Sequence, residues 1–211
     1  MSKKTMMQSI WLFALSTLVL FGCVSTGSNN AGSSLDPSMV KVLKDFPDHS
    51  FDAKAYIAGM QKGGKNLLVW KDPAADLSKY KSVAVSDFGS RLLPEQNKFS
   101  YSTFVATFNS NFKGGLSITK KNSANSLKIV GEIVECNPGS AAARIFLSYG
   151  AGKAGGAIAC EIYEPGKSRP SMRIYTRDTA SSGGDSVTYL NHIFNQLAFR
   201  TANTINTTVG R

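Results

Sequence analysis

The sequence has few of the residues that enzymes and metal sites most often use. Its 211 residues include three cysteines and two histidines, and 14 acidic side chains stand against 24 basic ones. Neither His49 nor His192 has a Cys, Asp or Glu at a recognisable metal-ligand spacing. No G-x-S-x-G motif marks a serine nucleophile. The sequence therefore predicts a protein that is not an enzyme and that holds no metal and no cofactor.

Long apolar runs are also scarce, which excludes a polytopic membrane protein. The one notable run extends from Ile10 to Gly22, and it is shorter than the roughly 20 apolar residues that a membrane-spanning helix needs. Its length is typical of the apolar region of a signal peptide, and Lys3 and Lys4 supply the positive charge that precedes such a region. We therefore expect residues 1–22 to be a signal peptide.

The apolar run ends in Leu20-Phe21-Gly22-Cys23, which resembles the lipobox of bacterial lipoproteins, although Phe21 is bulkier than the usual residue. The resemblance implies cleavage before Cys23, a diacylglyceryl thioether on its sulfur and a further acyl chain, such as palmitate, on its freed amine. Two or three such chains attach a protein stably to a membrane. By the same resemblance, Val24 favours the outer membrane, because an Asp there would favour inner-membrane retention. An ordinary secretory signal or an uncleaved anchor is the alternative.

The residues after the lipobox indicate a tether followed by one folded domain. Residues 24–37 are rich in Ser, Gly and Asn, a composition that behaves as a flexible coil. With the lipidated Cys23 they would form a linker over residues 23–37, followed by a single periplasmic domain over residues 38–211. The net charge of +10 would attract anionic lipid, lipopolysaccharide or cell-wall polymers, or would simply aid solubility. Nucleic acid is not an expected partner outside the cytoplasm.

Hydrophobic periodicity predicts both helices and strands in this domain. Helices are expected at residues 39–46, around residues 51–58 and ending near the Gly63-Gly64 pair, at residues 99–112 and at residues 186–206, the last capped by Asp185 or Ser186. Strands are expected at residues 67–70, 82–88, 116–119, 127–136, 157–164 and 171–178, with Pro165-Gly166 as a turn between the last two. The predicted fold class is α+β: a mixed, mostly antiparallel sheet covered by two main helices, at about 99–112 and 186–206.

Cys136 and Cys160 are a candidate disulfide, because they lie on two predicted strands and export to the periplasm permits such a bond. Cys160 shares a strand face with Ile158 and Ile162, so two buried thiols are the alternative. The register of the two strands would decide between them, and both interpretations stay open from the sequence.

The last predicted strand and its approach carry basic and aromatic residues at alternate positions. They are Arg169, Arg173, Tyr175 and Arg177. Because side chains of a strand alternate between the two faces of a sheet, these residues form a candidate anionic-ligand face for a phosphate, a uronate or a similar group. The alternative is a solvent-exposed outer face, with Met172 and Ile174 turned toward the core.

Two stretches of the chain resemble known bacterial lipoprotein domains. YKSVAVSDF at residues 80–88, the helix after it and NSLKIVGEIVE at residues 125–135 are similar to lipoprotein domains of the curli-secretion and penicillin-binding-protein-activator type. The run 144–160, EIYEPGKSRPSMRIYTR at residues 161–177 and GGD at residues 183–185 look like an uncharacterised bacterial lipoprotein family. This second resemblance covers the chain from about residue 66, implies an α/β lipoprotein domain and transfers no catalytic residue.

These observations together predict a non-catalytic protein of the bacterial cell envelope. It would be held by its N-terminal lipid, on the periplasmic side of the outer membrane, and would bind an envelope protein or a cell-wall polymer. An accessory subunit of an outer-membrane export or transport assembly is the alternative function.

Overall fold

A computed structural model describes residues 51–90, 93, 101–139, 153–180 and 185–209. All the described residues belong to one compact unit. The predicted signal peptide, Cys23, the linker and the helix at residues 39–46 lie outside the described residues. None of the helices in these ranges is long and apolar enough to span a membrane.

The described part consists of one sheet with helices on both sides. The helices are α2 (Ala53–Ile57), α3 (Ser102–Gly115) and α5 (Ser186–Thr208), with a short 3-10 helix at Leu77–Lys79. The strands are β1 (Gln61–Gly64), β2 (Leu67–Lys71), β3 (Ser82–Val85), β4 (Thr119–Lys120), β5 (Leu127–Asn137), β6 (Ala154–Tyr163) and β7 (Met172–Ala180).

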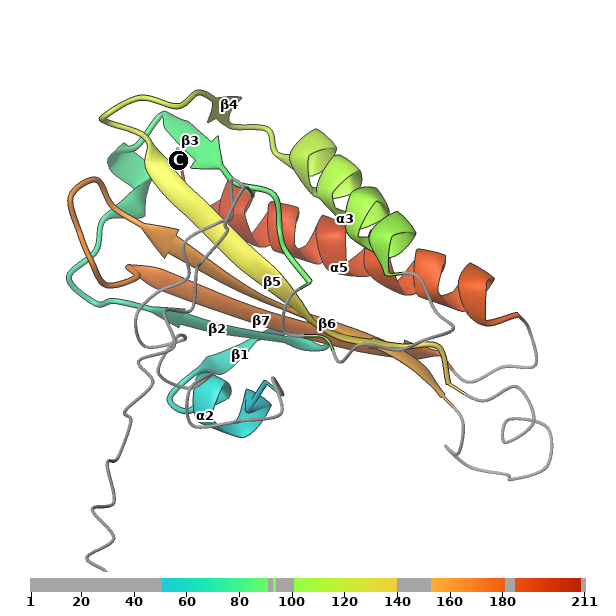
Figure 1. The fold of residues 1–211 in the computed structure, drawn as a ribbon. Coiled ribbons are helices and arrows are strands. Elements are labelled where there is room, and N and C mark those ends of the chain that lie inside the picture. Colours follow the sequence, from blue (N-terminus) through green and yellow to red (C-terminus); the bar gives the residue numbers. More distant parts are fainter. Residues whose placement is uncertain (1–50, 91–92, 94–100, 140–152, 181–184, 210–211) are drawn as a thin grey trace, which may run out of the picture. The chain divides into compact units, whose positions relative to one another are not determined.

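The sheet is mixed and mostly antiparallel, which confirms the predicted fold class. Its strand order is β1-β2-β7-β6-β5-β3-β4. Only β3 pairs in parallel, with β4 on one side and β5 on the other. Helices α3 and α5 lie side by side on one face of the sheet, and α2 lies on the opposite face (Figure 1). We call the first face the helix-covered side and the second the α2 side.

The packing of α5 explains why the helix-covered side is the main core. Asp185 caps the helix by accepting hydrogen bonds from the backbone N–H groups of Val187 and Thr188. Leu190, Phe194 and Leu197 are fully buried, as their spacing predicted. The helix can approach β6 closely because residue 156 is a glycine, whose added Cβ would lie 2.9 Å from Ile193 Cγ2.

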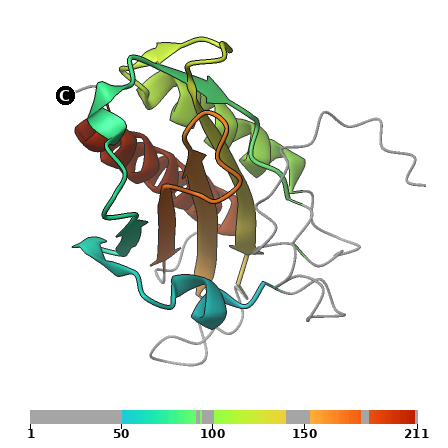
Figure 2. The ribbon, with the colours of Figure 1, turned by 90° about the vertical axis from the view of Figure 1, so that its left-hand side faces the viewer.

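The α2 side has a smaller apolar cluster, built on the small residues of β6. Ala157 and Ala159 are fully buried, and their short side chains leave room for the rings of Tyr56 and Tyr175, which belong to the same cluster. The hydroxyl of Tyr56 donates a hydrogen bond of 3.2 Å to the carbonyl of Cys160. Helix α2 lies across this face (Figure 2), where the Tyr56 ring, the Tyr56 hydroxyl bond and a 3.3 Å hydrogen bond from Arg173 to the Tyr56 carbonyl attach it to the sheet.

Several element boundaries differ from the sequence prediction: the strand expected at 116–119 is β4 at Thr119–Lys120, and β6 begins three residues early at Ala154. Two further differences have a clear physical cause. Helix α2 stops at Ile57, and the Gly63-Gly64 pair lies in strand β1 instead of ending a helix. The chain reverses before it at Gly59, which has φ +79°, a conformation that glycine adopts readily. Strand β3 ends at Val85 rather than at Phe88, because the backbone N–H and C=O of Phe88 bond to the side chain of Asn109 instead of to a strand.

The Cys136–Cys160 bridge is not present, and the register of the strands explains why. Cys136 lies opposite Gly156, whereas Cys160 lies opposite Gly131. Four residues along β6 correspond to about 13 Å, and a disulfide needs Cα atoms within about 7 Å. Both thiols are free and buried. Burial raises the pKa of Cys136 to about 12 and also raises the pKa of Cys160, so both stay protonated.

Candidate functional site

The α2 side of the sheet contains ionisable residues where the helix-covered side has apolar ones. Glu132 on β5 and Glu161 on β6 are buried. The hydroxyl of Tyr163 donates a 2.6 Å hydrogen bond to Oε2 of Glu161. A buried charge is costly unless polar groups surround it, so a face built in this way is specialised for something other than stability.

Arg173, Tyr175 and Arg177 lie on this side, and Met172 and Ile174 belong to the core on the other. Arg169 is outside the strand, exposed in the connection between β6 and β7. The sequence therefore placed three of the four candidate residues on a common face correctly. The alternative, a solvent-exposed outer face, holds only in part, because α2 packs on the same face.

The side chains of this row already bind other groups of the protein. Arg177 forms a two-point ion pair with Glu135, with distances of 2.6 Å and 2.8 Å, and this pair raises the pKa of Arg177. Glu135 and Arg177 lie on the two strands next to Ala157. Because the side chain of Ala157 is small, the two charged side chains can meet across it. Because the carboxylate occupies the guanidinium, Arg177 is a weak candidate for holding an external anion.

Arg173 and Tyr175 are also engaged. The guanidinium of Arg173 lies 4.9 Å from the ring centroid of Trp70 and 5.6 Å from that of Tyr56, which are cation–π distances. Tyr175 is 9% exposed, and burial raises its pKa. The predicted anionic-ligand face, Arg169, Arg173, Tyr175 and Arg177, stays a prediction. Of its members, Arg173 and Tyr175 contact Tyr56 of α2.

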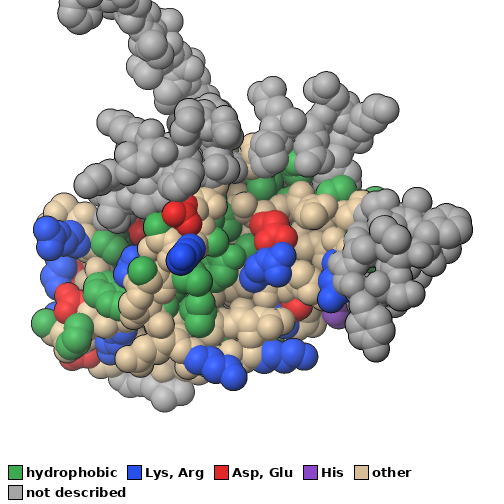
Figure 3. Space-filling model, turned by 90° about the horizontal axis from the view of Figure 1, so that it is seen from below, with side chains coloured by type: hydrophobic (Ala, Val, Ile, Leu, Met, Phe, Trp, Pro, Cys, Tyr) green, Lys and Arg blue, Asp and Glu red, His purple; other side chains and the backbone are tan. Residues whose placement is uncertain are grey.

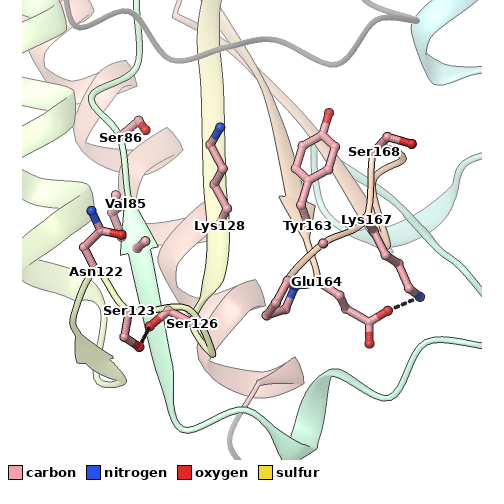
Figure 4. Close-up of a pocket in the computed structure, with 13 residues that line it drawn as sticks. Val85, Ser86, Asn122, Ser123, Ser126, Lys128, Tyr163, Glu164, Lys167 and Ser168 are labelled. Carbon is pink, nitrogen blue, oxygen red and sulfur yellow. Dashed lines mark hydrogen bonds and ion pairs between the residues drawn. The ribbon is translucent and has the colours of Figure 1, made fainter.

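A separate cleft lies on the sheet near the turn between β6 and β7. It has a volume of about 640 Å³, within the range typical of small-molecule sites. It is lined by Ala84, Val85, Ser86, Asn122, Ser123, Ser126, Lys128, Tyr163, Glu164, Pro165, Gly166, Lys167 and Ser168. The lining comes from β3, the segment between β4 and β5, β5 itself, and the β6–β7 turn (Figure 4).

Lys128 and Tyr163 stand in the centre of this cleft. They are directly opposite each other on β5 and β6, and their side chains extend in the same direction (Figure 4). Lys128 follows the buried Leu127 and precedes the buried Ile129, so strand alternation turns it to the α2 side. The cleft therefore has a lysine next to a tyrosine whose hydroxyl donates to the buried Glu161.

The first wall of the cleft, residues 121–126, is held by serine hydroxyls. The Ser126 hydroxyl donates a 2.6 Å hydrogen bond to the carbonyl of Lys121. It also lies 2.8 Å from the Ser82 hydroxyl and 2.7 Å from the Ser123 hydroxyl. These contacts tie the segment to β3 and leave a wall with hydroxyl groups at fixed positions.

The second wall, the β6–β7 turn, is held by Glu164. Its carboxylate pairs with Lys167 and lies 3.5 Å from Lys79. It accepts hydrogen bonds from the hydroxyls of Tyr80, at 3.2 Å, and Ser171, at 3.1 Å. Burial raises the pKa of Glu164, but the hydrogen bonds from Lys167 and Ser171 outweigh it and hold the pKa below its ordinary value. This carboxylate is therefore ionised and neutralised by lysines.

The charge of the lining follows from these contacts. Glu164 is the only acid in the lining, against Lys128 and Lys167, and Lys79 adds a second ammonium beside the same carboxylate. Figure 3, viewed from the α2 side, shows Lys and Arg side chains spread among apolar ones. A cleft with hydroxyls, one tyrosine and excess positive charge is suited to a polar ligand that carries negative charge.

Sequence reasoning did not single out Lys128 and Tyr163. The alternation in residues 127–136 contained a signal for Lys128, because a lysine between buried apolar neighbours must face the other side of the sheet. Tyr163 becomes meaningful only once β5 and β6 are paired. His192, by contrast, is exposed on α5, and the described residues contain no group of three His, Cys, Asp or Glu side chains that could hold a metal.

No protein-family model matches this chain, and no curated protein matches it in sequence. Several solved structures share part of its arrangement. PelC from Paraburkholderia phytofirmans, a dodecamer, has 11% identity and a TM-score of 0.40, with 63% of this chain and 96% of that one covered. A minor lipoprotein from Acinetobacter baumannii has 11% identity and a TM-score of 0.36, covering 61% and 94%.

A DUF330 protein from Xanthomonas campestris has 9% identity and a TM-score of 0.39, covering 66% of this chain and 89% of that one. At identities and TM-scores this low, the likeness carries no argument about function.

Proposed function

We propose that this chain is a lipid-anchored protein of the bacterial cell envelope that binds an anionic saccharide of the envelope without catalysis. The anchor is proposed from Leu20-Phe21-Gly22-Cys23 and the apolar run before it. The ligand is proposed from the cleft beside Lys128 and Tyr163. The single observation that carries the ligand is the excess of ammonium groups over carboxylates in a lining rich in hydroxyls.

An anionic saccharide fits this lining better than a plain ion or an apolar molecule. Sugar hydroxyls both donate and accept hydrogen bonds, and so do the hydroxyls of Ser86, Ser123 and Ser168 in the cleft. The ammonium of Lys128 would pair with a carboxylate or phosphate on the sugar. Because both walls are already held by internal hydrogen bonds, little ordering would be needed when the ligand binds.

Two envelope polymers supply this chemistry, and a binding experiment distinguishes them. Peptidoglycan carries carboxylates on its peptides, and lipopolysaccharide carries phosphates on its sugars. The mature acylated protein, which begins at Cys23, would be sedimented with purified peptidoglycan sacculi and, separately, tested against lipopolysaccharide micelles. We expect retention by sacculi that falls about tenfold in Lys128→Gln, the loss of one charge-assisted hydrogen bond.

Lys153→Gln is the matched control, because Lys153 is exposed just before the opposite end of β6 and the variant changes the net charge equally. An equal loss of retention in both variants would mean that only the overall charge matters, and it would overturn the cleft as the binding site. Binding to lipopolysaccharide alone, dependent on Lys128, would retain the cleft and assign the ligand to the other polymer.

The anchor is tested independently of the ligand. The intact mass of the protein extracted from membranes should show loss of residues 1–22 and the addition of lipid. Cys23→Ser should release the protein from the membrane fraction. A mature chain without lipid, or a chain that still begins at Met1, would overturn the anchor.

A further inference from the structure

The outer surface of helices α3 and α5 differs from the rest of the described surface in having almost no charge. The two helices contain one lysine, Lys113, and one arginine, Arg200, and no acidic residue. Lys113 pairs with Asp87 at 2.5 Å, and Arg200 pairs with Asp178 at 2.7 Å. The outward positions are Asn, Ser, Thr, Ala and Gly, together with His192, Val187 and Phe199.

The exposed lysines of the described residues lie elsewhere. They are Lys54, Lys62, Lys65, Lys71, Lys79, Lys81, Lys120, Lys121, Lys128, Lys153 and Lys167. A soluble surface normally mixes charges of both signs over all its faces. The α3–α5 surface departs from that pattern and instead has the low lysine and glutamate content of a protein–protein interface.

An exposed phenylalanine is a second, independent feature of the same surface. Phe199 is 67% exposed and Val187 is 49% exposed, and they are the large hydrophobic residues exposed in the described part of the chain. Both lie on α5. A phenylalanine left in water gains nothing for the fold, whereas aromatic residues at the centre of an interface often contribute most of the binding energy.

The two helices are also held rigidly to each other. The side-chain amide of Asn111 donates to that of Asn195 at 2.5 Å across the pair. Asn206 donates to the carbonyl of Gly115 and accepts from the backbone N–H of Ser117. A partner would therefore meet a preformed surface, which lowers the ordering cost of binding.

We propose that the α3–α5 surface, centred on Phe199, is where a second copy of this chain docks. The whole chain has a net charge of +10, and the proposed cleavage removes Lys3 and Lys4, so each mature copy has +8 (10 − 2). Two copies therefore repel wherever their lysine-bearing surfaces meet. The α3–α5 surface is the large described surface where that repulsion is absent. A two-fold arrangement would place the same neutral surface on both copies.

The proposed lipid anchor supports this inference, but the inference does not depend on it. Copies tethered to one membrane share a plane, which raises their effective concentration and lets a modest interface form. The cleft lies on the opposite side of the sheet, so a pair formed through α3 and α5 would leave both clefts open.

The test measures self-association of the mature acylated protein in detergent by sedimentation velocity over a range of concentrations. We expect a species larger than one chain in the wild type and at least about tenfold weaker self-association in Asn203→Lys, which adds like charges one turn from Phe199. Asn125→Lys is the matched control, because Asn125 is exposed outside the helices and the substitution is the same. It should associate as the wild type does.

A crosslinking arm in native membranes identifies the occupant. In Phe199→Cys, the new thiol is exposed while Cys136 and Cys160 are buried, so oxidation should give a dimer of this chain. Sedimentation as a single chain at every concentration would overturn the proposal, as would a Phe199→Cys crosslink only to a different protein. Neither readout uses a saccharide, so failure here is distinguishable from failure of the proposed function.

Discussion

The two sides of the sheet are built from the same strands but carry different kinds of side chain, apolar on one side and largely polar on the other. On the helix-covered side, Ile158, Ile162 and Ile174 are fully buried against α3 and α5. On the α2 side, the neighbouring positions of the same strands carry Glu161, Arg173 and Arg177. Burial of apolar area is the dominant favourable contribution to folding, so the first side supplies most of the stability. The α2 side contributes less stability and instead holds polar groups at defined positions.

The comparison implies that substitutions on the two sides should differ in kind. A change on the helix-covered side should act on the free energy of unfolding. A change at the cleft should act on ligand binding and leave the fold intact.

The largest effect is expected for Leu197→Ala on α5. Leu197 is fully buried in the main core, and removing such a side chain costs about 2–5 kcal/mol of unfolding free energy. Urea denaturation measures it. Phe199→Ala, two residues further on the same helix, is the control and should change stability by less than about 0.5 kcal/mol. Similar costs for the two would contradict the assignment of faces on α5.

A smaller effect is expected for Tyr56→Phe on the α2 side. The variant keeps the ring in its cluster but removes the 3.2 Å hydrogen bond to the carbonyl of Cys160. The expected loss is about 0.5–1.5 kcal/mol in the same denaturation experiment. A loss as large as that of Leu197→Ala would mean that the α2 side contributes to stability as the helix-covered side does.

The smallest effect is a pH dependence from Glu164. Its pKa in the folded protein lies below the ordinary value of 4.5, so its ionised form stabilises the fold. The contribution is fully present above the ordinary pKa and is lost as the pH falls through the lowered one. Between about pH 5 and pH 3, Glu164→Gln should therefore lose less stability than the wild type. Parallel pH curves for the two proteins would show that Glu164 does not support the β6–β7 turn.

The elements with strong periodicity could be predicted from the sequence. The apolar spacing of Leu190, Phe194 and Leu197 defined the buried face of α5, and all three are buried. Strand β1 was missed because Gln61-Lys62-Gly63-Gly64 has no apolar alternation. It forms a strand because the tight turn at Asn66, with φ 58°, folds it back onto β2.

The register-dependent features could not be predicted, because they depend on which residues of distant strands face each other. The pairing of Cys136 with Gly156 separates the two thiols. The same register places Lys128 beside Tyr163. A single strand considered alone contains neither fact. The sequence therefore left a Cys136–Cys160 bridge and two buried thiols as alternatives, of which the structure has the second, and it did not predict the cleft.

Hydrogen exchange of the mature acylated protein in lipid vesicles, with and without soluble peptidoglycan fragments, tests the different roles of the two sides most directly. The account predicts that the fragments slow exchange in peptides covering residues 121–130 and 163–168, which line the cleft, and leave the peptides of α5 unchanged. Unchanged exchange around the cleft, or slowing on α5 instead, would contradict it.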